Sequence, residues 1–297
     1  MKAAPFAYCR PADVDEAVEV LAGGDAKVLA GGQSLVPVLA MRLGRPGTLV
    51  DITAVPGLDT LEESDGELRV GAAVRQRRVE RSPTTRAVPL IGRAMPFVGH
   101  RELRSRGTVC GSLAHADPAA ELPSVAACLG ATLEVTGPAG PRTVAAADFV
   151  AGPMTTVLGA DELLTRVRFP VARPGEGFGF AEIARRHGDF ALAGVVVRVR
   201  RSGSGVAEAS LVGFGVSDRP VVRDVTSLLS AAVGSSGTVT EHDLRADTAT
   251  LAAGMVDTGG DAHGSPGYRA RLLGVLAARE LAAAWADAAR RDPQEER

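Results

Sequence analysis

In the first part of the chain, apolar residues recur at helical spacing in some segments and form short strand-like runs in others. Between residues 11 and 22 apolar residues recur at helical spacing, and Asp13 is placed to cap that helix. Residues 28–30 form a short apolar run that predicts a strand, 35–43 has helical character, and 48–52 predicts a second strand. A strand, a helix and a strand in this order predict two parallel strands joined by a crossover helix.

The same patterns continue along the rest of the chain. Further strands are expected at 67–73, 131–136 and 164–169, and further helices at 75–81, at 87–98 and in a segment with Pro123 in its first turn. After residue 179 we expect strands at 180–184, 193–200 and 209–216, followed by helices at 220–233, 241–255 and 267–290. The chain therefore has an α+β pattern.

A stretch rich in proline and glycine, PVARPGEGFG at 170–179, suggests a domain boundary. We expect a first domain at 1–175, with a small parallel βαβ subdomain at about 1–55 and a larger mixed or antiparallel α+β subdomain at 56–175. A second domain, of three antiparallel strands and helices, is expected at 176–290, with a polar, frayed tail at 291–297.

Composition excludes several classes of protein. The net charge of −2 provides no field for nucleic acid or an anionic membrane, and 4% aromatic residues disfavour a stacking platform for single strands. No apolar stretch approaches the roughly 20 residues of a membrane span, and the N-terminal segment has no secretory pattern, so we expect a cytoplasmic protein. Cys9, Cys110 and Cys128 are too scattered for a cluster or disulfide framework, and the five histidines lack ligand spacing, so no metal site is expected.

The first candidate for chemistry is the loop GGQS, between the predicted strand at 28–30 and the helix at 35–43. Ser34 is expected to be the N-cap, with Pro37 in the first turn, where a missing N–H costs little. Bare backbone before a helix N-terminus can hold an anion such as a diphosphate. The alternative is a tight turn whose glycines only provide a positive φ. The sequence of this loop matches neither the P-loop motif, nor the dinucleotide-binding motif GxGxxG, nor the GxSxG motif of a nucleophile elbow.

A second loop, TVCGS at 108–112, has the same small and hydroxyl-bearing character. Two such loops can hold a long diphosphate ligand from opposite sides. Asp117 and Glu121 follow, and their carboxylates can accept hydrogen bonds from ribose or ribityl hydroxyls. The alternatives are that Asp117 caps a helix before Pro118 and that Glu121 is a solvated first-turn carboxylate.

Four segments, taken in order, resemble one protein family. They are AGGQSLVPVLAMRLGRPGTLVDI, RGTVCGSLAHADPAAELP, DELLTRVRFP and RRHGDFALA, and GFGVSDRPVVR and YRARLLGVLAARELAAA add to them. Together they resemble the FAD-binding, or medium, subunit of the molybdenum hydroxylases. That family includes the medium subunit of aerobic carbon monoxide dehydrogenase and the flavin domain of xanthine dehydrogenase. The resemblance covers nearly the whole chain and implies a PCMH-type FAD-binding domain followed by a carbon monoxide dehydrogenase flavoprotein-like C-terminal domain.

The resemblance also implies a set of FAD-binding residues. The two loops that would hold the diphosphate are Ala30, Gly31, Gly32, Gln33, Ser34 and Leu35, and Thr108, Val109, Cys110, Gly111 and Ser112. Asp117 and Glu121 match the stretch that reaches the ribityl and adenosine side, Val98 and Leu164 match apolar lining positions, and Phe190 matches a residue that shields the isoalloxazine. Two positions depart from the family pattern: Glu182 stands where some relatives carry a lysine that touches FAD, and Cys110 stands where a glycine is usual.

By this resemblance, the chain carries FAD and transfers electrons, with no catalytic acid, base or nucleophile of its own. Substrate would be oxidised on a large molybdopterin-binding subunit, and two [2Fe–2S] clusters on a small subunit would pass electrons to FAD and on to an external acceptor. The complex would be a dimer of heterotrimers. Two alternatives stay open: a stand-alone FAD-dependent oxidase or dehydrogenase, and a flavin-free scaffold or interaction protein.

Overall fold

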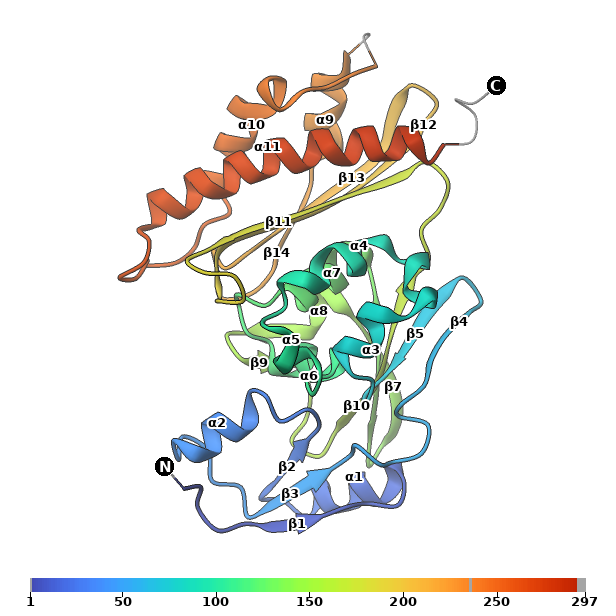
Figure 1. The fold of residues 1–297 in the computed structure, drawn as a ribbon, viewed down its shortest axis with the longest axis vertical. Coiled ribbons are helices and arrows are strands. Elements are labelled where there is room, and N and C mark those ends of the chain that lie inside the picture. The colour runs from blue at the N-terminus through green and yellow to red at the C-terminus, as the bar shows by residue number, and fades with distance from the viewer. Residues whose placement is uncertain (1, 235–236, 293–297) are drawn as a thin grey trace. The chain divides into compact units, whose positions relative to one another are not determined.

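The computed structural model describes residues 2–234 and 237–292 (Figure 1). The tail expected at 291–297 therefore lies largely outside the described residues. The chain forms two compact units, and each contains more than one stretch of sequence. Unit 1 comprises 1–87, 100–116 and 131–170, and unit 2 comprises 88–99, 117–130 and 171–297. The linear domain boundary near 175 stays a prediction.

Unit 1 begins with a parallel three-stranded sheet. Its strands are β1 (Ala7–Cys9), β2 (Ala26–Leu29) and β3 (Thr48–Asp51) in the order β1-β3-β2, with α1 (Val14–Ala22) and α2 (Leu35–Ala40) between them. The predicted β2-α2-β3 crossover is confirmed because β2 pairs in parallel with β3. Asp13 caps α1 as expected, accepting a hydrogen bond of 2.8 Å from the N–H of Glu16. The pairing of β1 with β3 was not predicted.

A second sheet in unit 1 is antiparallel and has the order β4-β5-β10-β6-β7. Its strands are β4 (Leu61–Ser64), β5 (Glu67–Gly71), β10 (Leu163–Pro170), β6 (Thr132–Gly137) and β7 (Gly140–Ala145). The remaining elements of unit 1 are α3 (Gln76–Arg81), η1 (Pro83–Ala87), α5 (Arg101–Arg104), α6 (Val109–His115), α8 (Ala146–Phe149), β8 (Val150–Gly152) and β9 (Thr155–Thr156).

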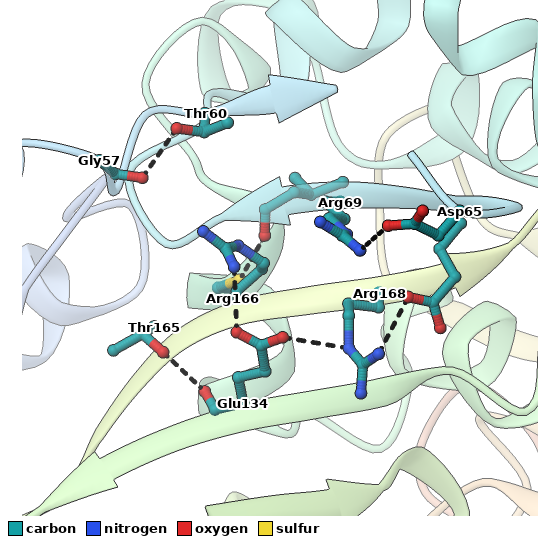
Figure 2. Close-up of polar contacts among 11 residues, drawn as sticks. Gly57, Thr60, Asp65, Arg69, Glu134, Thr165, Arg166 and Arg168 are labelled. Atoms are coloured by element: carbon teal, nitrogen blue, oxygen red, sulfur yellow. Dashed lines mark hydrogen bonds and ion pairs between the residues drawn. The ribbon is translucent and has the colours of Figure 1, made fainter. Parts of the chain in front are cut away.

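The two faces of this sheet differ in polarity, as strand alternation requires. One face buries apolar side chains completely, among them Val70 and Val167. On the other face Glu134 of β6 binds two arginines of β10, Arg166 at 3.2 Å and Arg168 at 3.1 Å (Figure 2). Both ion pairs are partly exposed, so each contributes about 1 kcal/mol or less to the free energy of unfolding. The apolar face provides most of the stability.

Unit 2 contains an antiparallel sheet with the order β11-β12-β13-β14. Its strands are β11 (Glu176–Ala184), β12 (Ala191–Ser202), β13 (Gly205–Phe214) and β14 (Val221–Asp224), and its helices are α4 (Pro89–Ala94), η2 (Met95–Phe97), α7 (Glu121–Leu129), α9 (Thr226–Val233), α10 (Glu241–Ala253) and α11 (Pro266–Arg290). Three of these strands were predicted and β14 was missed. The expected helix at 220–233 begins only at Thr226, because the segment before it pairs with β13.

Helix α11 lies against one face of this sheet, and α4 and α7 pack on the other face (Figure 1). Two glycines of β11 permit the approach of α11. A Cβ on Gly177 would lie 2.0 Å from the carbonyl oxygen of Ala284, and one on Gly179 would lie 2.7 Å from that of Glu280. These glycines belong to the stretch at 170–179 that was expected to mark a domain boundary. They are instead strand residues on which a helix backbone rests.

Side chains of α11 also bind the open edge of β11. The N–H of Phe178 donates to Asp287 at 3.2 Å, and the N–H of Phe180 donates to Glu280 at 3.1 Å. Arg93 of α4 forms an ion pair of 2.7 Å with the same Asp287. The edge strand therefore has acceptors for two N–H groups that no neighbouring strand reaches.

Candidate functional site

The two loops predicted to hold an anion lie against each other in unit 1. A Cβ added to Gly31 would lie 2.4 Å from the carbonyl oxygen of Arg106 and 2.6 Å from the Cα of Gly107. Gly31 is therefore required by the contact between the loops. Gly32 has a φ of +71°, so the turn interpretation also holds for the second glycine.

The first loop exposes donors at the start of α2. In the part of the chain that the structure describes, the N–H groups of Gly32, Gln33 and Ser34 donate to no acceptor. The Gln33 side chain folds back and donates to the carbonyl of Gly31 at 3.0 Å. Ser34 stands at the N-cap position but makes no capping hydrogen bond, which corrects the expected cap. Three successive unpaired donors at a helix N-terminus form a suitable cradle for a diphosphate.

The second loop is fixed by the segment at the start of α3. The N–H of Gln76 donates to the carbonyl of Gly107 at 2.8 Å, and its side chain donates to that of Thr108 at 3.3 Å. Thr108 caps α6, because its hydroxyl accepts from the N–H of Gly111 at 3.0 Å. A Cβ on Gly111 would lie 2.6 Å from that hydroxyl oxygen. Glycine at position 111 is therefore required by the hydrogen bond with which Thr108 caps α6.

Cys110 does not face the loop surface. Its side chain is buried, and its Sγ lies 3.6 Å from the carbonyl oxygen of Val70 in the apolar core of unit 1. Burial raises the pKa of the thiol to about 12. The side chain is therefore an inert core group, and only the backbone of residue 110 is placed to meet a ligand. Val109 is also buried, whereas Ser112 is partly exposed.

Two arginines near the loops were not predicted as site residues. Arg75 donates to the carbonyl of Arg106, the same group that Gly31 approaches. Burial lowers the pKa of Arg75, and the charge of Arg106 lowers it further. Their positive charges favour an anionic ligand. No spacing in the sequence connects residues 75 and 106, which meet because Arg75 and Thr108 form a bridge between strand-like segments.

The remaining predicted residues divide between the units. Leu164, on β10 in unit 1, is buried with 4% of its surface exposed. Unit 2 contains Val98 at the end of η2, Asp117, Glu121 in the first turn of α7, Glu182 on β11 and Phe190 before β12. Asp117 accepts from the N–H of Ala119 at 2.8 Å within the turn at Pro118, but the N-cap of α7 is Ala120, so Asp117 does not cap a helix as the alternative interpretation expected. Glu121 is buried and not solvated.

Asp117 and Phe190 line one cavity of about 560 Å³ in unit 2. Phe190 is 68% exposed and contributes an apolar side chain to the wall of this cavity. The other ionisable groups of the wall are Arg185, Asp189, Asp218, Asp257, Asp261, His263 and Arg269. Arg185 pairs with Asp189 at 3.2 Å and Arg269 with Asp261 at 2.7 Å, which leaves an acidic wall.

Comparisons with known proteins agree with this architecture. Residues 4–172 match the family model described as the FAD binding domain in molybdopterin dehydrogenase, and 178–284 match the CO dehydrogenase flavoprotein C-terminal domain. The nicotine 6-hydroxylase medium subunit of Paenarthrobacter nicotinovorans is 37% identical over 96% of this chain and 99% of its own length. The carbon monoxide dehydrogenase medium chain of Hydrogenophaga pseudoflava is 32% identical over 95% and 97%. The crystal structure of quinoline 2-oxidoreductase from Pseudomonas putida 86 superposes with a TM-score of 0.87 at 35% identity, covering 97% of this chain and 99% of that one.

No helix among the described residues is both long and apolar enough to cross a membrane.

Proposed function

Because this chain belongs to the family of FAD-binding medium subunits of molybdopterin dehydrogenases, we propose that it transfers electrons from a partner's [2Fe–2S] clusters through FAD to an external acceptor. The partners would be a small iron–sulfur subunit and a large molybdopterin-binding subunit, in a cytoplasmic dimer of heterotrimers. Relatives named as medium subunits or medium chains support this proposal. The observation that carries it is the row of unpaired N–H groups at Gly32–Ser34 packed against the second loop.

In this proposal each loop has a defined task. The N–H groups of Gly32–Ser34 donate to diphosphate oxygens, and Arg75 and Arg106 add positive charge beside them. Thr108 fixes the first turn of α6, because its hydroxyl accepts a hydrogen bond from the N–H of Gly111. Bound FAD supplies the redox chemistry, since it can accept electron pairs and release them singly or together.

Residues of unit 2 would contact the rest of FAD. Asp117 and Glu121 would accept hydrogen bonds from hydroxyls of the ligand, and Val98 would provide apolar surface, as would Leu164 of unit 1. Phe190 would shield the isoalloxazine with its exposed ring. Glu182 would also meet FAD, and its role differs from that of the lysine in some relatives. No general acid, base or nucleophile is assigned, because substrate bonds would break on the partner.

Purification of the chain with and without its partner subunits tests this function. We expect a yellow protein that contains FAD. The flavin should be reduced by substrate only when the iron–sulfur and molybdopterin subunits are present. Reduction of FAD by a small-molecule donor in the isolated chain would support the stand-alone enzyme instead. A colourless chain that takes up no added FAD would contradict the proposal altogether.

A further inference from the structure

Exposed apolar side chains in unit 1 adjoin the contact between the two loops. Helix α2 follows the first loop, and α5 precedes the second. On α2 and just after it, Val36 is 54% exposed, Met41 is 47% exposed and Leu43 is 75% exposed. On α5, Leu103 is 42% exposed. Such a group of large apolar side chains in water marks a surface that another molecule covers.

The loops hold α2 and α5 next to each other. A Cβ on Gly31, shortly before α2 begins at Leu35, would lie 2.4 Å from the carbonyl oxygen of Arg106. Arg106 comes directly after the last turn of α5, and the N–H of Gly107 donates at 2.7 Å to the carbonyl of Leu103 on that helix. The apolar side chains of the two helices therefore belong to one region of unit 1.

The charge of this region is positive. The exposed charged residues within 34–45 and 100–106 are four arginines and a single carboxylate: Arg42, Arg45, Arg101, Arg106 and Glu102. The four guanidinium groups form no ion pair with a carboxylate among residues 2–234 and 237–292. The whole chain, in contrast, has a net charge of −2. Positive charge is therefore concentrated beside the loops.

We call this region the loop-side face and define it by its four apolar residues and four arginines: Val36, Met41, Leu43, Leu103, Arg42, Arg45, Arg101 and Arg106. Its composition is typical of a protein interface, where apolar side chains and arginine are enriched and lysine, aspartate and glutamate are depleted. A nucleic acid would pair its phosphates with the arginines but would leave the apolar side chains in water. The loop-side face fits a protein surface that presents apolar side chains together with carboxylates, which arginine binds bidentately.

The position of the loop-side face selects one protein among the possible partners. Electron transfer requires the donor to lie close to FAD, and this face adjoins the loops proposed to hold the FAD diphosphate. In the proposed function the iron–sulfur subunit delivers electrons to FAD, whereas the molybdopterin-binding subunit does not exchange electrons with FAD directly. The iron–sulfur subunit is therefore the partner that must be held at this place.

We propose that the loop-side face is the docking surface for the iron–sulfur subunit, which covers the four apolar side chains and pairs its carboxylates with the arginines. The inference rests on the proposed function, because it takes that subunit as the partner. Exposed arginines attract an acidic partner over a distance that salt shortens, so binding weakens as the salt concentration rises. The apolar side chains provide the part of the affinity that salt does not screen.

Binding of the iron–sulfur subunit to variants of the FAD-loaded full chain tests the proposal. The subunit is obtained from the dissociated complex, and the Kd is measured by biolayer interferometry at about 50 mM and about 500 mM NaCl. Leu43→Asp should weaken binding about tenfold or more at both salt concentrations, because it places a charge in the apolar contact. Arg101→Glu should weaken binding about fivefold at the lower concentration and less than about twofold at the higher one, because salt screens exposed charges.

Two substitutions in unit 2 are matched controls. Val275→Asp changes an apolar residue of α11 that is 48% exposed, and Arg219→Glu reverses the charge of an exposed arginine. Both should keep the wild-type Kd, and all four variants should keep the wild-type Tm and FAD content, because each substituted side chain is exposed. Wild-type affinity in both Leu43→Asp and Arg101→Glu would overturn the inference.

Hydrogen exchange in the wild-type chain provides a second readout that depends on no substitution. Binding of the iron–sulfur subunit alone should slow the exchange of amides within 36–43 and 101–106. Protection that requires the molybdopterin-binding subunit, or that arises from dimerisation of the free chain, would overturn the inference, because another surface would then cover the face. If the iron–sulfur subunit binds without protecting these amides, the docking surface fails and the proposed function stands. If that subunit does not bind the chain under any condition, the proposed function fails as well.

Discussion

Substitution of Gly31 by alanine tests the contact between the two loops most directly. The added Cβ would lie 2.4 Å from the carbonyl oxygen of Arg106 and 2.6 Å from the Cα of Gly107. Both neighbours are backbone atoms, which cannot turn aside as a flexible side chain can. Relief requires the segments to separate by close to 1 Å, and overpacking of this kind costs about 1–3 kcal/mol.

The expected net effect is smaller than the steric cost alone. Replacing glycine by alanine restricts the unfolded chain and so returns about 0.4–1 kcal/mol of stability. We expect Gly31→Ala to lower the free energy of unfolding by about 1 kcal/mol, which corresponds to a decrease in Tm of about 2 °C in a protein of this size. Separation of the loops should also displace the donors at Gly32–Ser34 from the diphosphate.

Two measurements check this prediction: thermal unfolding of the flavin-free chain and the Kd for FAD. Gly152→Ala is a matched control in unit 1, because a Cβ there meets no atom within 4 Å. The control should keep the wild-type FAD affinity and should have a Tm equal to or slightly above that of wild type, because alanine restricts the unfolded chain. A Gly31→Ala variant with unchanged Tm and unchanged FAD affinity would refute the reasoning that loop contact requires glycine at this position.

Three further substitutions follow from the same structure. Gly111→Asp should abolish FAD retention, since a negative charge would lie beside the diphosphate. Gly111→Ala is the control, because its Cβ meets the Thr108 hydroxyl in the same way but carries no charge. Equal flavin content in both variants would argue against the charge effect. Cys110→Ala should leave the Kd for FAD unchanged, and native Cys110 should resist alkylation at pH 8, because burial raises the pKa of its thiol to about 12; rapid labelling of this residue, mapped by mass spectrometry, would contradict its placement. Glu182→Gln should stabilise the flavin-free chain increasingly as pH rises: the folded-state pKa of about 8 exceeds the ordinary value of 4.5, so stability is fully present below pH 4.5 and is lost as pH rises through 8. With residual solvent access reducing the penalty, the difference should reach about 2 kcal/mol at pH 9 in urea unfolding, and a difference of opposite sign would contradict the raised pKa of Glu182.

The sequence predicted elements well where periodicity was local. The crossover of β2, α2 and β3 was visible because each element carries its own apolar pattern and a recognisable boundary. Strand β1 has three residues and no alternation to detect, so its pairing with β3 depends on tertiary structure alone. Strand β14 was assigned to a helix because Pro220 and the apolar residues after it also fit a first helical turn.

The candidate site was predictable only in part, for a different reason. The letters GGQS and TVCGS identify small residues but not the atoms those residues approach. Gly31 is needed for its contact with residues 106–107, and Cys110 directs its thiol into the core. The unpartnered oxygen of Glu182 depends on how β11 packs, and the raised pKa of Glu182 depends on burial first and on the nearby charge of Glu121 second. Such information lies in the packing of distant segments.

The acidic residues of α11 that bind the edge of β11 have a consequence for the behaviour of the chain in solution. An uncovered edge strand recruits strands from other molecules and begins ordered aggregation. Here Glu280 and Asp287 accept from two of the N–H groups that a foreign strand would need. The long helix thus protects the sheet against unwanted self-association, in addition to covering its core.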